Sequence, residues 1–382
     1  MEITIVAIGS RGDVQPLVAL GVGLQQKGHL VHVVAGDEFE SLIQGAKLGF
    51  SPLGMNIQAA MESHTDLFRF MASIKDRVLK VCETTQDAVV STFLGVSTCS
   101  LAREREIPFF YALPMPGLQT HEFPHPLFLP LPLGKRYNAL TYRLSDKHVT
   151  ASCEDARCLF LEPPPTYLFC FSPTVVPRPS DWGDFAHVTG YWFLDRPSDW
   201  RPPAKLEAFL ETGPSPVYVG FGSALGDDPR RLTALVLDAL ASAGQRGVLA
   251  SGWGALGDAE LSPDVFVIDS VPHDWLFPRV AAAIHHGGAG TTAAALRCGT
   301  PSVIVPFGLD QPFWGRRVRG LGAAAEPIAL KRLTVERLAT AIRSVVEDTQ
   351  IRERATMLGE RIRSEDGVGN AVGIIERAMT AR

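Results

Sequence analysis

Short apolar runs rich in β-branched residues alternate with amphipathic segments along the first third of the chain. Residues 2–8 form such a run, and residues 15–27 carry leucine and valine at helical spacing. Three more apolar runs predict strands, at 30–35, 87–92 and 108–113, and the segments between them are compatible with helices. Strands that alternate with helices predict a parallel sheet covered on both faces.

The same alternation returns after a polar, proline-rich stretch at 196–204, which predicts a hinge between two domains. Strands are predicted at 216–223, 247–252, 265–270, 281–286 and 302–307. The helix predicted at 227–244 has Pro229 near its first turn and Gly244 past its end, and the one at 290–298 stops at Gly299. The second half therefore repeats the architecture of the first.

Between residues 115 and 180 the alternation loosens, and prolines cluster in PMPG, FPHPLFLPLP and EPPPT. Long loops in a compact domain are usually functional or disordered. The apolar content, which includes Phe123 and Phe128, argues against plain disorder. Two interpretations stay open: an apolar wall or lid over a ligand, or residues that pack under a loop.

Composition narrows the class of protein. A length of 382 residues suits two domains, and no run of about 18 apolar residues predicts a membrane-spanning helix. The net charge of −5 and the absence of an arginine-rich run argue against a nucleic-acid partner. The start of the chain lacks the features of a secretory signal. The six cysteines contain no C-x-x-C pair and fit neither a zinc framework nor a disulfide scaffold, so we expect a cytoplasmic protein.

The segment HHGGAGTT, residues 285–292, allows three interpretations: a metal site, a phosphate cradle, or a turn that binds nothing. Successive strand residues point to opposite faces, so His285 and His286 cannot easily chelate one ion. Glycines let the main chain approach a ligand, and the following helix offers unpaired N–H groups and a positive dipole end. These features favour an anion site, with a hydrogen bond from His286 and a hydroxyl from Thr291 or Thr292.

Other turns after predicted strands carry further candidates. Asp310 and Gln311 follow the strand at 302–307 and offer donors and acceptors for vicinal hydroxyls, although Asp310 alone is also typical of a helix N-cap. Asp13 lies in the turn after the first strand, where a helix N-terminus favours its ionised form. It suits a general base, or an N-cap without chemistry.

These residues resemble the GT-B nucleotide-sugar glycosyltransferases, and within them the UDP-glucose sterol 3-O-glucosyltransferases and bacterial natural-product glycosyltransferases. The resemblance covers nearly the whole chain. The segments that carry it are IVAIGSRGDVQPLVALG, SDW, VTGYWF, PVYVGFGS and VPHDWLFPRVAAAIHHGGAGTTAAALRCGTPSVIVPFGLDQPFW. It implies an α/β GT-B fold with two Rossmann-like parallel-sheet domains facing across a cleft: an acceptor domain at 1–200, a nucleotide-sugar domain at 201–366, and a C-terminal helix at 367–382 expected to pack back on the first domain.

Carried over residue by residue, the resemblance makes Asp13 the general base and Phe123 and Phe128 part of the acceptor site. The residues implied in nucleotide-sugar binding are Ser223, Trp253, Val271, His286, Gly288, Ala289, Gly290, Thr291, Asp310 and Gln311. In that set, Trp253 and the main chain at Val271 hold the uracil, while Asp310 and Gln311 hold the sugar. Plant relatives begin their nucleotide signature with a tryptophan where this chain has Ser270.

The implied reaction is an inverting transfer of a hexose, glucose from UDP-glucose, to a hydroxyl of a hydrophobic polycyclic acceptor such as a sterol or terpenoid. The product is a β-O-glycoside, and no metal or other cofactor is expected. Two other enzyme classes remain as alternatives: a nucleotide-sugar epimerase with the same two-domain fold, and a nicotinamide-dependent oxidoreductase resting on Gly9, Gly12 and Asp37. A non-catalytic sensor of sugar nucleotides is a third alternative.

Overall fold

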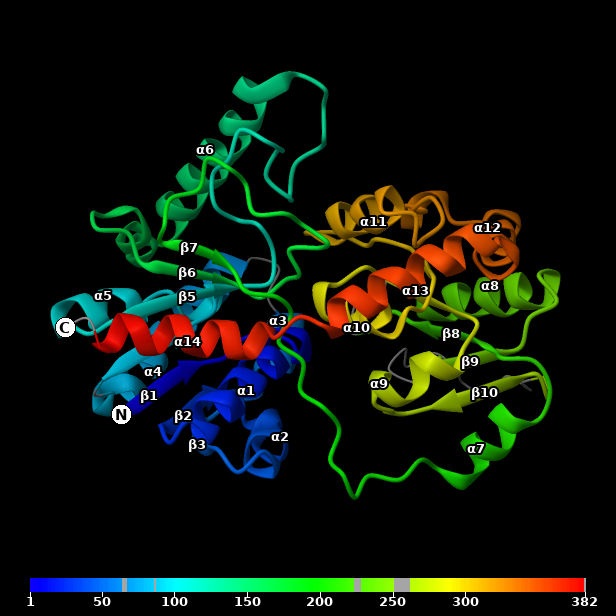
Figure 1. The fold of residues 1–382 in the computed structure, drawn as a ribbon, viewed down its shortest axis with the longest axis horizontal. Helices are drawn as coiled ribbons and strands as arrows, with labels where there is room; N and C mark the ends of the chain where they lie inside the picture. Colours follow the sequence, from blue (N-terminus) through cyan, green and yellow to red (C-terminus); the bar gives the residue numbers. More distant parts are fainter. Residues whose placement is uncertain (64–66, 86, 223–227, 251–261, 381–382) are drawn as a thin grey trace. The chain divides into compact units, whose positions relative to one another are not determined.

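The computed structural model describes residues 1–63, 67–85, 87–222, 228–250 and 262–380, and it divides into two compact units (Figure 1). Unit 1 comprises Met1–Leu194 together with Glu365–Arg382, and unit 2 comprises Asp195–Ser364. The first change of unit therefore lies immediately before the proline-rich stretch that predicts a hinge. Ser223 and Trp253 lie outside the described residues.

Unit 1 is built on a seven-stranded parallel sheet with the order β3-β2-β1-β4-β5-β6-β7. Its strands are β1 (Glu2–Val6), β2 (Leu30–Ala35), β3 (Gly49–Pro52), β4 (Ala88–Ser91), β5 (Phe109–Leu113), β6 (Thr166–Phe169) and β7 (Ala186–Val188). Its helices are α1 (Arg11–Gln26), α2 (Glu40–Gly45), α3 (Ile57–Ser63), α4 (Leu67–Val81), α5 (Thr98–Glu104), α6 (Gly134–Ser152) and α14 (Gly367–Thr380), with short 3-10 turns η1 (Asp37–Phe39), η2 (Cys82–Thr84), η3 (Phe93–Gly95) and η4 (Glu154–Phe160).

Both faces of the unit 1 sheet are covered, and its central strands β1, β4 and β5 are buried along nearly their whole length. Ile3 and Ile5 of β1 belong to the core that α1 and α14 close, whereas Val6 faces the other way, against Gly95 of η3. Glycine permits the close approach of α14, since a Cβ at Gly23 of α1 would collide with Val368. The C-terminal helix is thus an integral layer of unit 1, beside α1 in Figure 1.

Unit 2 holds a five-stranded parallel sheet with the order β10-β9-β8-β11-β12. Its strands are β8 (Val217–Gly220), β9 (Gly247–Ala250), β10 (Val265–Ile268), β11 (Ala282–His285) and β12 (Ser302–Ile304). Its helices are α7 (Ala204–Glu211), α8 (Pro229–Ser242), α9 (His273–Leu276), α10 (Ala289–Cys298), α11 (Gln311–Gly320), α12 (Val335–Glu347) and α13 (Thr349–Arg363), with 3-10 turns η6 (Phe277–Arg279) and η7 (Leu330–Arg332).

Alternation along the strands of unit 2 divides its core between the two faces. Val217 and Val219 of β8 pack with the leucine and isoleucine residues of α8 and α12. Tyr218, which points the opposite way, packs with Trp275 and Phe277. This is the pattern expected of parallel strands buried on both faces. The two predicted parallel-sheet domains are therefore confirmed.

The prediction that residues 115–180 lack regular alternation was wrong in part, because this segment contains α6 and β6. The prolines that dominate its composition stop at Pro132 and resume at Pro163, so α6 itself has none. Its buried residues are mostly small or polar, namely Asn138, Ala139, Thr141 and Tyr142, and its leucines are exposed. A helix with this inverted polarity lacks the apolar, core-facing periodicity on which the sequence prediction depends.

One pair of cysteines also departs from the prediction. Cys99 of α5 and Cys158 of η4 form a disulfide, although they are 59 residues apart in sequence. The spacing of cysteines in the sequence could not predict this pair, because the packing of α5 against η4 brings the two residues together. Among the described residues, no helix combines the length and apolar composition needed to cross a bilayer.

Candidate active site

Three neighbouring strands of unit 2 end at the same edge of the sheet and carry most of the predicted donor residues. β11 lies between β8 and β12, and all three run parallel. A Cβ at Gly222, after β8, would lie 3.4 Å from Cε1 of His286. A Cβ at Gly287 would lie 3.2 Å from the carbonyl oxygen of Gln311. The turns after β8, β11 and β12 are therefore in contact at the strand ends, where open parallel sheets bind ligands.

The turn from β11 to α10 requires its glycines. Gly287 has a φ of 89°, a conformation that strongly favours glycine. Gly288 is the N-cap of α10 and makes no side-chain cap. A Cβ at Gly288 would collide with Nε2 of His286, so the imidazole lies directly over the start of the helix. The first turn of α10, which includes the predicted residues Ala289, Gly290 and Thr291, therefore begins beside this imidazole.

The two histidines differ in environment, as the strand geometry predicts. His285 is fully buried, and its Nδ1 accepts a hydrogen bond from the Gly287 amide at 3.1 Å. Burial lowers its pKa to about 3, so it is a neutral structural residue at pH 7. His286 is half-buried, and burial lowers its pKa to about 4. Each neutral imidazole keeps one N–H donor. Within the described residues, no cluster of metal-ligating side chains forms here or elsewhere.

Buried polar atoms without hydrogen-bond partners gather at this turn. They are Nε2 of His285, Nδ1 of His286 and Oγ1 of Thr292. Buried polar groups are nearly always paired, and each unpaired one costs about 1–3 kcal/mol. His285 faces the opposite side of the strand, whereas an anion held by the helix N-terminus would give the His286 imidazole a partner. The turn therefore has the composition of an anion-binding site.

Asp310 and Gln311 form the start of α11. Oδ2 of Asp310 accepts a hydrogen bond from the indole of Trp314 at 2.7 Å. Oε1 of Gln311 accepts from the amides of Phe307 and Gly308, at 2.7 and 3.1 Å, so it braces the turn after β12. Leu309, just before Asp310, has a φ of 53° and is 72% exposed. Lys47 and Glu106 have the same left-handed conformation, so the strain at Leu309 does not by itself assign a function.

Of the three residues predicted near the uracil or the diphosphate in addition to the β11–α10 turn, the structure describes only Val271. Val271 follows β10 and is buried, with its side chain in the core beside Tyr218 and Trp275. Its main chain is therefore fixed by packing. Ser223 and Trp253 lie outside the described residues.

The predicted base, Asp13, lies in unit 1 at the third position of α1. Its Oδ2 accepts hydrogen bonds from the amide and the hydroxyl of Ser10, at 2.8 and 2.9 Å. Burial raises the pKa of Asp13, and the two hydrogen bonds from Ser10 oppose this shift. A carboxylate with a raised pKa is a stronger base than an exposed one. The N-cap interpretation was wrong, because Ser10 is the N-cap of α1 and Asp13 occupies the N3 position of its capping box.

Phe123 and Phe128, the predicted acceptor residues, are half-buried in the segment before α6. The ring of Phe128 lies edge-on to His125, with 6.0 Å between centroids. His125 is buried, and burial lowers its pKa to about 4. The segment is therefore packed against the unit while it keeps part of its aromatic surface accessible.

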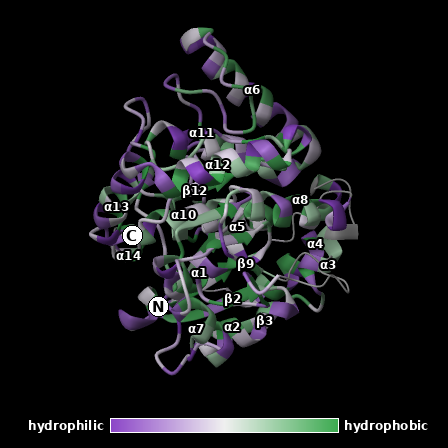
Figure 2. Cartoon of the chain, turned by 90° about the vertical axis from the view of Figure 1, so that its right-hand side faces the viewer, coloured by the Kyte–Doolittle hydropathy of each residue, from purple (hydrophilic) through white to green (hydrophobic). Residues whose placement is uncertain are grey.

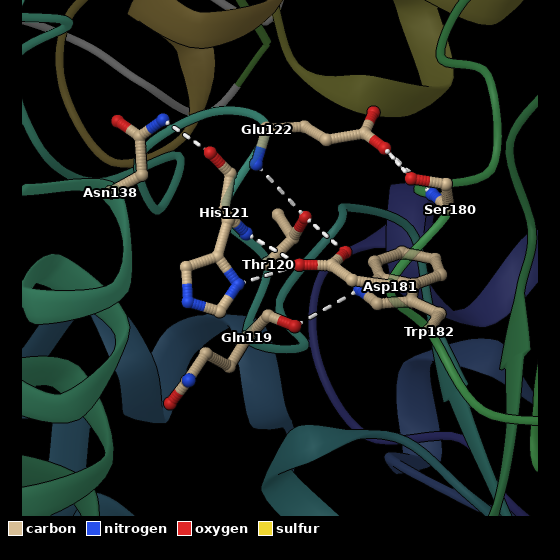
Figure 3. Close-up of polar contacts among 8 residues, drawn as sticks. All are labelled: Gln119, Thr120, His121, Glu122, Asn138, Ser180, Asp181 and Trp182. Atoms are coloured by element: carbon tan, nitrogen blue, oxygen red, sulfur yellow. Dashed lines mark hydrogen bonds and ion pairs between the residues drawn. The ribbon is translucent and has the colours of Figure 1, made fainter. Parts of the chain in front are cut away.

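A polar cluster that the sequence did not predict holds this segment in place (Figure 3). Asp181 accepts hydrogen bonds from the Thr120 hydroxyl (2.6 Å), the His121 amide (2.7 Å) and Nδ1 of His121 (2.9 Å). Burial alone would raise the pKa of Asp181, but these hydrogen bonds bring it below its usual value. A histidine oriented by a carboxylate through Nδ1 can act as a base through Nε2.

The neighbours of Asp181 complete the cluster. Oε1 of Glu122 accepts from the amide and hydroxyl of Ser180, at 2.7 and 2.8 Å, and the indole of Trp182 donates to the Gln119 carbonyl at 3.2 Å. Residues 180–182 are therefore joined to residues 119–122 by hydrogen bonds. The only sequence signal for this cluster was the SDW motif, which by itself gives no partner.

Comparison with known proteins agrees with this architecture. Residues 3–102 match the glycosyltransferase family 28 N-terminal domain, and residues 235–375 match the C-terminal domain of erythromycin biosynthesis protein CIII-like proteins. The glycosyltransferase of kitacinnamycin has a similar structure, with a TM-score of 0.74 at 22% identity over 99% of both chains.

Two sterol 3-beta-glucosyltransferases are similar in sequence. One, UGT80A2 of Arabidopsis thaliana, is 35% identical over 97% of this chain and 64% of its own length. Another, from Emericella nidulans, is 36% identical over 99% of this chain and 30% of its own length. The chain thus spans less than two thirds of these relatives. It carries the N-terminal domain of glycosyltransferase family 28 and an erythromycin CIII-like C-terminal domain, in a GT-B fold.

Proposed function

We propose that the protein is an inverting glycosyltransferase that transfers a hexose, glucose from UDP-glucose, to a hydroxyl of a hydrophobic polycyclic acceptor such as a sterol. The observation that carries the proposal is the β11–α10 turn, where glycines, a helix N-terminus and unpartnered buried polar atoms occur together. The similarity to sterol 3-beta-glucosyltransferases supports the choice of donor and acceptor class.

In this proposal the diphosphate binds at the N-terminus of α10. Main-chain N–H groups and the helix dipole stabilise the charge that develops on the leaving diphosphate. Neutral His286 donates a hydrogen bond to a phosphate oxygen. We propose that these groups suffice without a metal ion.

The sugar binds beside Asp310 and Gln311. The Trp314 indole orients the Asp310 carboxylate, and the amides of Phe307 and Gly308 hold the Gln311 side chain. Positioning of this kind lowers the barrier by presenting the anomeric carbon in a reactive orientation.

Asp13 takes the proton of the acceptor hydroxyl as it attacks the anomeric carbon. The attack occurs from the face opposite the diphosphate, so an α-linked donor gives a β-glycoside. The raised pKa of Asp13 favours this proton transfer. The epimerase alternative has no support from either family model.

The test is a transfer assay with UDP-glucose and a panel of sterols, triterpenes and flavonoids, with and without EDTA. We expect a β-glycoside from the wild type in both conditions and almost none from Asp13→Asn. Asp37→Asn is the matched control, because Asp37 also begins a helical turn after a strand and accepts an amide hydrogen bond, from Gly54 at 2.9 Å.

Other outcomes have distinct meanings. An epimerised nucleotide sugar formed without acceptor would establish the alternative enzyme class. Loss of transfer in His121→Gln with normal activity in Asp13→Asn would move the base to the His121–Asp181 pair. No glycoside with any acceptor, together with tight nucleotide binding, would contradict the reaction and leave the donor site standing.

A further inference from the structure

Exposed apolar side chains are concentrated in one part of unit 1. Of the 12 large hydrophobic residues recorded as exposed among the described residues, eight lie between positions 127 and 161, including Leu129 at 68% and Leu133 at 64%. A concentration of exposed apolar side chains is typical of an interaction site. The segment is therefore expected to contact a partner with an apolar surface.

The leucines of α6 form a stripe on its outer face. Leu133, at its N-cap, Leu140 and Leu144 follow one another at spacings of seven and four residues, which places them on one side of a helix. The opposite side is buried against unit 1 and contains Ala139 and Tyr142. Figure 1 shows α6 standing out from the sheet, and Figure 2 shows apolar and hydrophilic segments alternating along it.

Cations repeat with the same spacing as the leucines. Arg136, Arg143 and Lys147 each lie three residues after a leucine of the stripe, and all three are exposed. Residues three apart are neighbours on a helix surface, so each leucine has a cation beside it on the next turn. The result is a leucine row flanked by a row of positive charge, hereafter the α6 face.

Acidic side chains do not neutralise the α6 face. Residues 123–153 contain four cations and one carboxylate, a net charge of +3 in a chain whose net charge is −5. The next two carboxylates along the chain are in ion pairs: Glu154 with Arg157 at 3.6 Å and Asp155 with Lys75 at 2.9 Å. The local charge is therefore opposite in sign to that of the whole protein.

A shallow hollow extends this surface beyond α6. It has a volume of about 380 Å³ and is lined by Asp146, Lys147, Thr150, Arg157, Phe160 and Leu161. Phe160 and Leu161 are themselves exposed. The mixed apolar and cationic surface thus continues from the end of α6 onto η4.

We propose that the α6 face is a docking surface for an anionic lipid membrane, with the leucine row in the interfacial layer and Arg136, Arg143 and Lys147 on lipid phosphates. Long cationic side chains beside apolar ones reach the headgroups while the leucines enter the apolar boundary. The positive charge complements the negative surface of such a bilayer. Docking does not depend on the proposed reaction, although it would suit an enzyme whose acceptor is a membrane lipid.

The test is flotation of the full chain with vesicles of phosphatidylcholine, alone or with phosphatidylserine. We expect the wild type to float with the anionic vesicles and salt to release it. Arg136→Gln/Arg143→Gln/Lys147→Gln should weaken binding roughly 100-fold. Leu133→Ser/Leu140→Ser/Leu144→Ser should abolish it. The matched control is Arg352→Gln/Arg354→Gln/Arg361→Gln on exposed positions of α13, which removes the same charge and should leave flotation unchanged.

Wild-type protein that stays with the soluble fraction, or α6 variants that float like the wild type, would overturn the proposal. So would a dimer in light scattering that the leucine variant converts to a monomer, because it would assign the α6 face to a second copy of the chain. Circular dichroism melting verifies that each variant is folded. Donor hydrolysis or transfer to an acceptor in detergent should stay normal in all variants, which separates this test from the test of the reaction.

Discussion

The turns after the central strands β1 and β11 look alike in sequence but are opposite in chemistry. Both join a buried strand to a helix through glycine. In unit 1 the side chain of Asp13 takes the place of an anionic ligand, because its carboxylate accepts hydrogen bonds from the Ser10 amide and hydroxyl. In unit 2 the start of α10 has no side-chain cap and lies beside the neutral His286 imidazole.

The difference supports the proposal that the phosphate binds to unit 2. A phosphate approaching the β1–α1 turn would meet a carboxylate, whereas at the β11–α10 turn it would meet N–H donors. The same contrast argues against the nicotinamide alternative, which rests on Gly9, Gly12 and Asp37. Asp37 is engaged with the Gly54 amide instead. The proposal therefore assigns the general base to the β1–α1 turn and the anion site to the β11–α10 turn.

The largest expected effect comes from removing the base. Asp13→Asn should lower kcat of glycosyl transfer by about 10²–10⁴-fold, because general base catalysis contributes that much. The dissociation constant of UDP-glucose, measured by calorimetry, should stay within about twofold of the wild-type value. Equal loss of donor affinity would show that Asp13 belongs to the anion site.

A pair of glycine variants compares the two turns directly. Gly288→Ala places a Cβ against His286, although the φ of −61° suits alanine, and should weaken UDP-glucose binding by roughly 10–100-fold. Gly12→Ala meets only the Ser10 hydroxyl, at 3.6 Å, and should leave affinity unchanged. The reverse order of the two dissociation constants would place the nucleotide in unit 1.

The pH profile of transfer examines the environment of Asp13. Because burial raises its pKa, activity should fall with decreasing pH at a value above the ordinary range of aspartate. Ser10→Ala removes a hydrogen bond that lowers this pKa, so the acidic limb of kcat should move to higher pH. A limb that stays in place or moves downward would mean that another group controls the rate.

The smallest effect concerns the unpartnered hydroxyl beside α10. Thr292→Val should increase the free energy of unfolding by about 1 kcal/mol in the ligand-free protein, because it removes a buried, unsatisfied group. The control is Thr233→Val: its hydroxyl is also buried but donates to the Pro229 carbonyl at 2.9 Å, so the variant should be destabilised. Equal changes in urea unfolding would contradict the assignment of an unsatisfied site.

Sequence reasoning predicted the elements whose signals are local. The β1, β2 and β11 strands are mostly apolar runs, and Gly299 ends α10 with a φ of 68°, as a C-terminal glycine should. The neighbourhood of His286 and Gln311 followed from the rule that parallel strands end at one edge. These signals suffice to predict a candidate donor site at the strand ends of the unit 2 sheet.

Other features depend on tertiary contacts that leave no local pattern. The His121–Asp181 hydrogen bonds and the Cys99–Cys158 disulfide join segments about 60 residues apart. Helix α6 escaped prediction because its leucines face outward, which reverses the rule that apolar periodicity marks the buried side. The same reversal is the basis for the proposed membrane contact.

The most direct test of the central claim is calorimetric titration of UDP-glucose into the wild type, Gly288→Ala and Asp13→Asn, each assayed for transfer in parallel. The account predicts that Gly288→Ala loses binding, and that Asp13→Asn binds the donor normally while it loses transfer. Normal donor binding by Gly288→Ala together with lost binding by Asp13→Asn would contradict the division of roles between the two turns.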